Sequence, residues 1–467
     1  MASRLSNVVR RERTRAELRL LRSAIEAWLT RRRLADRDAA GAYVGRHKTQ
    51  LDTIEHVLGA AASQLADDAD HLDTSLPEGE FYEKCRTLDI ATVWLQRMWE
   101  FYRQKFDQRD DDRVGAVLRA ADEVVWSCCH GVMERARKID PSIDHGAVPL
   151  PFIAPEFSPA AVESNQPLVG ALQLSVDLPG WDDELKKLVS SLPLLSLPPW
   201  CVDSPWWLVY VAHEIGHHVQ GKLGLGGYYR DGVQKAAAAV SGGSADRWHG
   251  WADEIFADVF SVLSIGRWAA WSVAEVERST APRMRAPTRR YPAPATRLLL
   301  LERTARALAL NAADVLTDVD VAALEAEQEH VTAEAVVGFA LGALPNGTTL
   351  GGLVGLGKEP AQLAAQFEEK GAFWRAQLRS AVPPAPVRDL ITPRHVIAGA
   401  VGAWRDVSRV EDEAKRAANT AALAKATIAT LQVSGPAGAR GDRQPEAPRL
   451  GKILAQRLSE AGARAQA

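Results

Sequence analysis

Residues 204–221 read SPWWLVYVAHEIGHHVQG, and this stretch decides how the chain is organised. Its apolar residues have the density of a buried helix rather than the alternation of a strand. Ser204 can cap such a helix, Pro205 suits its first turn, and Gly221 and Gly224 are natural stops. The stretch therefore predicts an apolar helix that starts near Ser204.

Three polar side chains interrupt this apolar helix. His213 and His217 are four residues apart and so share one face, and Glu214 follows His213 directly. Two imidazoles at this spacing can bind one metal ion, while the carboxylate can take a proton from a metal-bound water. Satisfied core histidines would explain one of these residues, but they explain the group, with His218, poorly. The pattern indicates a metal site.

A second helix is predicted over residues 251–261, which read WADEIFADVFS. Glu254 and Asp258 share a face there, because they are also four apart. A catalytic zinc ion takes three protein ligands and keeps one position for water, so a third ligand is needed. Glu254 can supply it, with Asp253 as the alternative, and Asp258 can orient a ligand histidine through its free ring nitrogen.

The HExxH motif followed by ExxxD resembles the gluzincins, the thermolysin-like zinc peptidases. The resemblance implies one Zn2+ per chain, with His213, His217 and Glu254 as ligands. It also implies Glu214 as general base and acid, and Asp258 as the hydrogen-bond partner of His213.

The resemblance covers about residues 190–270 and has departures. The gap between the two motifs is longer than in thermolysin and Gly-rich at 224–229 and 241–244, which predicts either a flap over the cleft or a solvent loop. No histidine follows His218 until His249, which argues against a metzincin. Deformylases also combine HExxH with a cysteine ligand upstream. Cys201 is only twelve residues before His213, on the approach to the same helix, which argues against a deformylase.

The sequence offers several candidates for the residue that would stabilise an oxyanion. Tyr291 and Arg297 lie in YPAPATR, after a basic stretch, and either side chain near the metal can serve. The alternative is a proline-rich turn before the next helix. Tyr228 and Tyr229 are weaker candidates for the same role.

The fold class is predicted to be mainly α with a small α+β zincin-like core, whose short mixed or antiparallel sheet packs on the HExxH helix. Proline-punctuated apolar runs at 148–153, 172–176 and 192–197 are the strand candidates, and 192–197 is expected at the sheet edge that pairs with an extended substrate. The expected parts are a helical domain (1–145), the core (146–345), a helical region with an Ala-rich helix over 406–432 (346–434), and a flexible linker with a loosely held terminal helix (435–467).

Composition narrows the class of protein. The 467 residues carry 56 Lys and Arg against 59 Asp and Glu, a net charge of -3, which argues against nucleic-acid binding. An Arg-rich N-terminus predicts a solvated helix face or a docking surface for an acidic partner. Four cysteines fit a reducing cytoplasm, and neither an export signal nor a membrane span is expected.

These observations predict a cytosolic zinc endopeptidase acting on a peptide or protein substrate. The competing interpretation is a non-catalytic zincin-like scaffold that binds a regulatory protein partner through its flanking helices. Glu214 separates the two, because a scaffold needs the metal ligands and has no need for that carboxylate.

Overall fold

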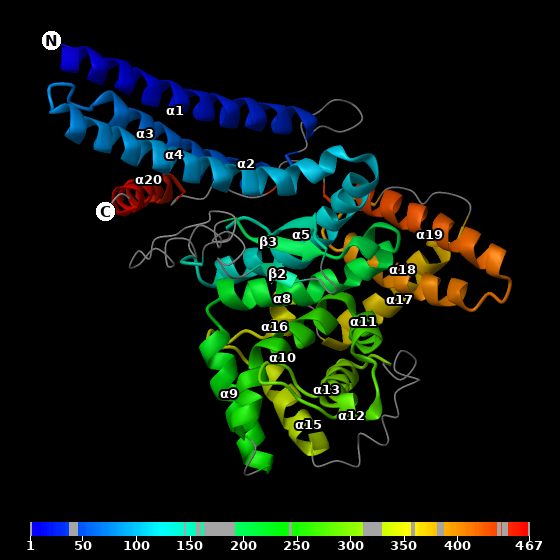
Figure 1. Cartoon of the computed structure of the whole chain (residues 1–467). Coiled ribbons are helices and arrows are strands. Elements are labelled where there is room, and N and C mark those ends of the chain that lie inside the picture. Colours follow the sequence, from blue (N-terminus) through cyan, green and yellow to red (C-terminus); the bar gives the residue numbers. More distant parts are fainter. Residues whose placement is uncertain are drawn as a thin grey trace.

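The computed structural model describes residues 2–36, 45–143, 146–155, 160–162, 192–241, 245–311, 329–355, 360–380, 387–436, 440 and 447–465. The chain is mainly helical, as predicted, with one small sheet. Figure 1 shows α1 to α4 and α20 grouped at the top of the view, the sheet, α5 and α8 beneath them, and most of the other helices below and to one side.

The first helices are α1 (Ala2–Ala35), α2 (Lys48–Ile54), α3 (Ala60–Asp70), α4 (Glu78–Asp107) and α5 (Asp112–Ile139). The central ones are α8 (Val211–Lys222), α9 (Gly226–Ser241), α10 (Ala245–Ile265), α11 (Arg267–Glu277), α12 (Ala281–Met284) and α13 (Pro294–Ala307). The last are α15 (Glu329–Ala340), α16 (Leu350–Val354), α17 (Pro360–Leu378), α18 (Thr392–Ser408), α19 (Glu413–Ser434) and α20 (Ala447–Arg464). The predicted Ala-rich helix is thus displaced, since it spans 413–434 as α19.

The sheet is mixed, which confirms one of the two predicted forms. Its strands are β1 (Leu150–Ile153), β2 (Ala160–Val162) and β3 (Leu194–Leu197), in the order β1-β3-β2. β1 runs parallel to β3, and β2 runs antiparallel to it. The expectation that 192–197 forms the sheet edge is wrong, because β2 covers the side of β3 left open by β1. The candidate strand at 172–176 lies outside the described residues.

The sheet separates two hydrophobic cores. Side chains of successive strand residues point to opposite faces, so Leu194 packs in one core and Leu195 and Leu197 pack in the other. The core on the Leu194 side is built mainly from α1 to α4 and α20, and the larger core on the other side surrounds α8 and α10. A strand buried on both faces explains why 192–197 reads as a continuous apolar run.

The C-terminal segment is held more firmly than its composition predicts. Helix α20 packs against α3 and α4 and buries Leu454, Leu458 and Ala461, so the expectation of a loosely held helix is wrong. In the predicted linker, Arg440 is 3% exposed, its guanidinium pairs with the buried Glu123, and its carbonyl accepts a hydrogen bond from Thr49. A periodicity of apolar residues could reveal α20, but no local pattern reveals the partner of a single arginine.

The contribution of this buried ion pair to stability can be tested by replacing Arg440. Arg440→Ala removes one partner and leaves Glu123 buried beside Arg46 alone, so we expect a loss of about 3 kcal/mol in the free energy of unfolding. Urea denaturation measures it, with Arg449→Ala, at an exposed site of α20, as the matched control. Equal stability of the two variants would contradict the anchoring role.

Several arginines of α1 have acidic partners within the chain. Arg10 pairs with Asp89 of α4, Arg32 lies 2.6 Å from Asp107, and the Arg33 guanidinium lies 2.7 Å from a Glu55 carboxylate oxygen. These pairs favour the interpretation of a charged helix face over that of a docking surface. Among the helices described, none has both the length and the apolar character needed to cross a membrane.

Candidate metal centre

The metal helix begins later than the sequence predicts. Residues Pro205–Tyr210 form a 3-10 helix, and α8 begins at Val211. Aromatic packing fixes this entry, because the Trp207 ring stacks on Trp271 with centroids 5.1 Å apart. The predicted stop is confirmed, since α8 ends at Lys222 and Gly224 adopts a left-handed φ of +63° that favours glycine.

Close contact between α8 and α10 brings the two motifs together. A Cβ atom at Gly216 would lie 2.8 Å from the Ala257 Cα atom of α10, closer than real Cβ contacts. Glycine therefore allows the two helix backbones to touch between His213 and His217. Gly216 cannot be singled out from the sequence, because the need for glycine there depends on a partner helix.

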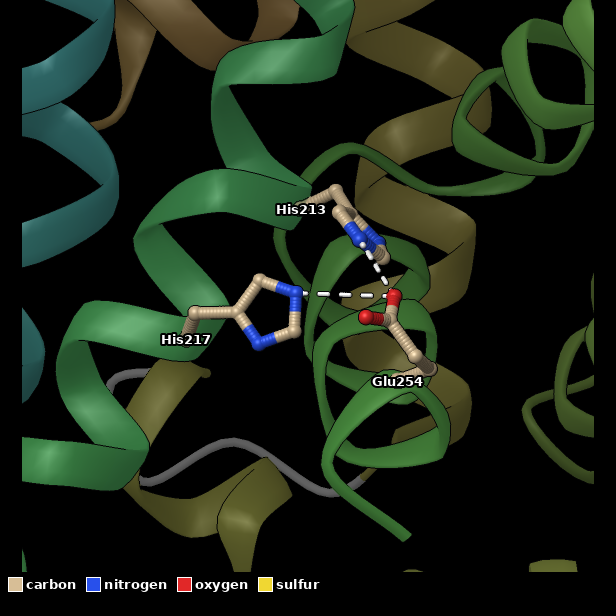
Figure 2. Close-up of side chains that lie close together, drawn as sticks. All are labelled: His213, His217 and Glu254. Atoms are coloured by element: carbon tan, nitrogen blue, oxygen red, sulfur yellow. Dashed lines mark ion pairs between the residues drawn. The ribbon is translucent and has the colours of Figure 1, made fainter. Parts of the chain in front are cut away.

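The three predicted ligands converge in this contact (Figure 2). The His213 Nε2 atom lies 3.3 Å from Glu254 Oε2, and the His217 Nε2 atom lies 3.6 Å from the same oxygen. The three residues are at most 7% exposed, and their ligand atoms lie within 4.8 Å of one another. Glu254 Oε2 is buried and accepts no well-directed hydrogen bond within the described structure.

This geometry fits a tetrahedral metal ion. A zinc ion bonded at about 2.1 Å to each of its ligand atoms holds those atoms about 3.4 Å apart, close to the two measured separations. Two imidazole nitrogens and one carboxylate oxygen are a donor set typical of catalytic zinc. A buried His213–His217–Glu254 group can therefore hold a metal ion.

Asp258 and Arg297 lie behind His213, on the side away from Glu254. Asp258 Oδ1 lies 2.8 Å from His213 Nδ1, on the ring nitrogen away from Glu254. Arg297 in turn donates to both Asp258 oxygens, at 2.7 and 2.8 Å, and to Glu277 at 2.7 Å. A carboxylate held on the far nitrogen selects the tautomer that leaves Nε2 available as a ligand. The sequence predicted this role for Asp258 and did not predict that Arg297 supports it.

The charges of the group are tightly coupled. Burial alone would lower the pKa of His213, but the carboxylates of Asp258 and Glu254 raise it to about 10. Burial alone would raise the pKa of Glu254, but the two imidazoles beside it hold that pKa well below its usual range. Burial would likewise raise the pKa of Asp258, and Arg297 instead lowers it. Both carboxylates are therefore ionised and able to attract a cation.

Removing the charge of Asp258 should weaken metal binding without abolishing it. Asp258→Asn keeps the shape of the side chain but loses the charge that orients His213 and balances Arg297. We expect the dissociation constant for zinc to rise about 10- to 100-fold, measured by competition with a chromophoric chelator. Asp253→Asn, on the same helix, is the matched control, and equal affinities in the two variants would contradict the role of Asp258.

Glu214 and Tyr291 line hollows beside the metal group. Glu214 is 8% exposed and lines a cleft of about 890 Å³ together with His217 and Glu254. Glu214 also lines a second hollow of about 380 Å³, whose other walls include His213 and Tyr291. Tyr291, 37% exposed, therefore shares this hollow with His213 and Glu214 and is open to solvent.

Other sequence candidates are engaged elsewhere. Arg297 directs three of its nitrogens to carboxylates, so we assign it a positioning role in place of the predicted oxyanion contact. The hydroxyls of Tyr228 and Tyr229 donate to carbonyls at the end of α15. Asp253 accepts a hydrogen bond from Gln220 and lies outside the metal group.

Two remaining cleft features differ from the sequence prediction. The long gap between the motifs is largely helix α9, so neither a flap nor a solvent loop describes 226–241, while 242–244 lie outside the described residues. Arg290 was not singled out, yet its Nε atom donates to Glu254 Oε1 at 3.2 Å. The run of basic residues before Tyr291 was the one signal that pointed to it.

Comparisons with protein-family models, with curated proteins and with solved structures find no match to this chain. The functional interpretation therefore depends on the geometry of the site itself.

Proposed function

We propose that the protein is a zinc-dependent peptidase of the gluzincin type, most simply an endopeptidase. The observation that carries this proposal is the convergence of His213, His217 and Glu254, with both histidine Nε2 atoms at distances from Glu254 Oε2 that suit zinc and with Glu214 beside them in an open cleft. In this proposal the sheet and α8 form a zincin-like core. β2 contacts α8, as the predicted packing of sheet on metal helix requires.

Each residue then has a defined task. When bound by the three ligands, zinc would polarise a scissile carbonyl and acidify a water molecule. Glu214 takes the proton of the attacking water and delivers it to the leaving amine. The Tyr291 hydroxyl donates to the oxyanion of the tetrahedral intermediate, and Asp258 keeps His213 in its ligating orientation.

The alternative is a zincin-like scaffold without catalysis, in which the flanking helices bind a regulatory partner. A scaffold needs a buried metal group but gains nothing from a carboxylate that faces the cleft. Glu214 lines both hollows at the metal group, which favours an enzyme. The four described cysteines are free thiols, which supports a reducing, cytoplasmic environment in this proposal.

The test begins with the metal content of protein purified without added metal, by elemental mass spectrometry. We expect close to one zinc per chain, and zinc-dependent cleavage of a proteome-derived peptide library that a chelator stops and added zinc restores. A chain that takes up no zinc at neutral pH would contradict the metal site. A fully loaded chain that cleaves no peptide would instead favour the scaffold.

A further inference from the structure

Two hollows of different chemistry meet at Glu214. The larger cleft extends from Glu214 along α8 and α9, and the smaller hollow extends from Glu214 toward α11 and α13. In the proposed peptidase, the scissile bond lies beside Glu214. Side chains on opposite sides of that bond therefore enter different hollows.

The larger cleft carries basic side chains beside its catalytic carboxylates. Its lining includes Lys222, Arg230 and Arg290, of which Arg290 contacts Glu254. Among the lining residues that the structure describes, Asp253 is the one acidic side chain outside the catalytic group, and it is engaged by Arg230 at 3.6 Å and by Gln220. Lys222, at the end of α8, forms no ion pair with any described residue. A lysine in the cleft that no described acidic side chain pairs with can bind a carboxylate of the substrate.

The smaller hollow has an apolar wall. Its walls include Val273, Val276 and the Pro292 and Pro294 rings. The charged groups among its lining residues bind one another or belong to the metal group. Arg297 pairs with Glu277 at 2.7 Å, and the Tyr210 hydroxyl donates to a backbone carbonyl. A charged side chain lying against Val273, Val276 and the proline rings would lose water without gaining a partner on that wall, whereas an apolar one would bury apolar surface there.

We infer that the substrate is a polypeptide with an acidic residue on one side of the scissile bond and an apolar residue on the other. This inference rests on the proposed peptidase function. The acidic side chain lies in the larger cleft near Lys222 and Arg230, and the apolar side chain lies against Val276 in the smaller hollow.

The experiment uses the full-length, zinc-loaded chain and a proteome-derived peptide library, with cleavage sites read by mass spectrometry. We expect Asp or Glu to be enriched at a position on one side of the cleaved bond, and Leu, Ile, Val or Phe at a position on the other. Fluorogenic peptides that carry this pair of residues then report kcat/KM.

Two substitutions separate the hollows. Lys222→Glu should lower kcat/KM for the acidic peptide about tenfold and raise it for a peptide with Lys at that position, because the local charge is reversed. Val276→Lys should remove the apolar preference and leave the acidic preference in place. Lys235→Glu and Val240→Lys, at exposed sites of α9 away from both hollows, are the matched controls.

The outcomes are distinct. Preferences that shift one at a time, each with its own variant, support the inference. Zinc-dependent cleavage without the acidic and apolar pattern, or a pattern unmoved by either variant, overturns it and leaves the peptidase function intact. A zinc-loaded chain that cleaves nothing removes the peptidase function, and this substrate assignment with it.

Discussion

Replacing Glu214 by Gln is expected to keep the bound zinc and to lower kcat by about three orders of magnitude. The amide has nearly the same shape as the carboxylate and lies beside the ligands without being one of them. It cannot accept the proton of the attacking water or return a proton to the leaving amine. Elemental analysis measures the metal, and single-turnover cleavage of a peptide found in the library measures the rate.

A matched substitution controls for the loss of a carboxylate elsewhere in the chain. Glu369→Gln removes an exposed carboxylate of α17 and should leave both zinc content and rate unchanged. If Glu214→Gln kept full activity, proton transfer by this residue would be wrong even with zinc in place. If it lost zinc as well, Glu214 would act through the structure of the site and not through the chemistry.

The local part of the site followed from helix geometry. Residues four apart share a helix face, so the His213–His217 and Glu254–Asp258 pairs could be read from spacing alone. Burial of such residues is costly without a partner, which made a shared site the simplest explanation. The structure places the four side chains together, with the ring nitrogens of His213 divided between Glu254 and Asp258 as expected.

The remaining features depend on contacts between distant segments. The position of a strand within a sheet is fixed by its neighbours, and β2 (Ala160–Val162) is too short to show a period. The roles of Arg290 and Arg297 arise because a long side chain can reach many partners, and only the tertiary fold selects Glu254 and Asp258. The glycines at 226–227 suggested a loop, yet α9 is held as a helix by packing against α10 and α15.

Replacing the proposed ligand His217 should strongly lower the affinity for zinc. His217→Ala leaves two protein ligands, and we expect the affinity for zinc to fall about 100- to 1,000-fold, since a four-ligand zinc site is worth about 10 to 16 kcal/mol in total. The purified variant should therefore contain little zinc and show no zinc-dependent cleavage. His218→Ala is the matched control, because His218 is the neighbouring histidine and lies outside the metal group.

Thermal unfolding provides a readout that does not depend on catalysis. A ligand that binds the folded chain alone stabilises it by about 4 kcal/mol at 1,000 times its dissociation constant, so zinc should raise the Tm of the unaltered protein and of His218→Ala. At the same zinc concentration the Tm of His217→Ala should move little. A full zinc-dependent rise in the His217→Ala variant would mean that the ion binds elsewhere, and the cluster of His213, His217 and Glu254 would lose its claim to be the metal centre.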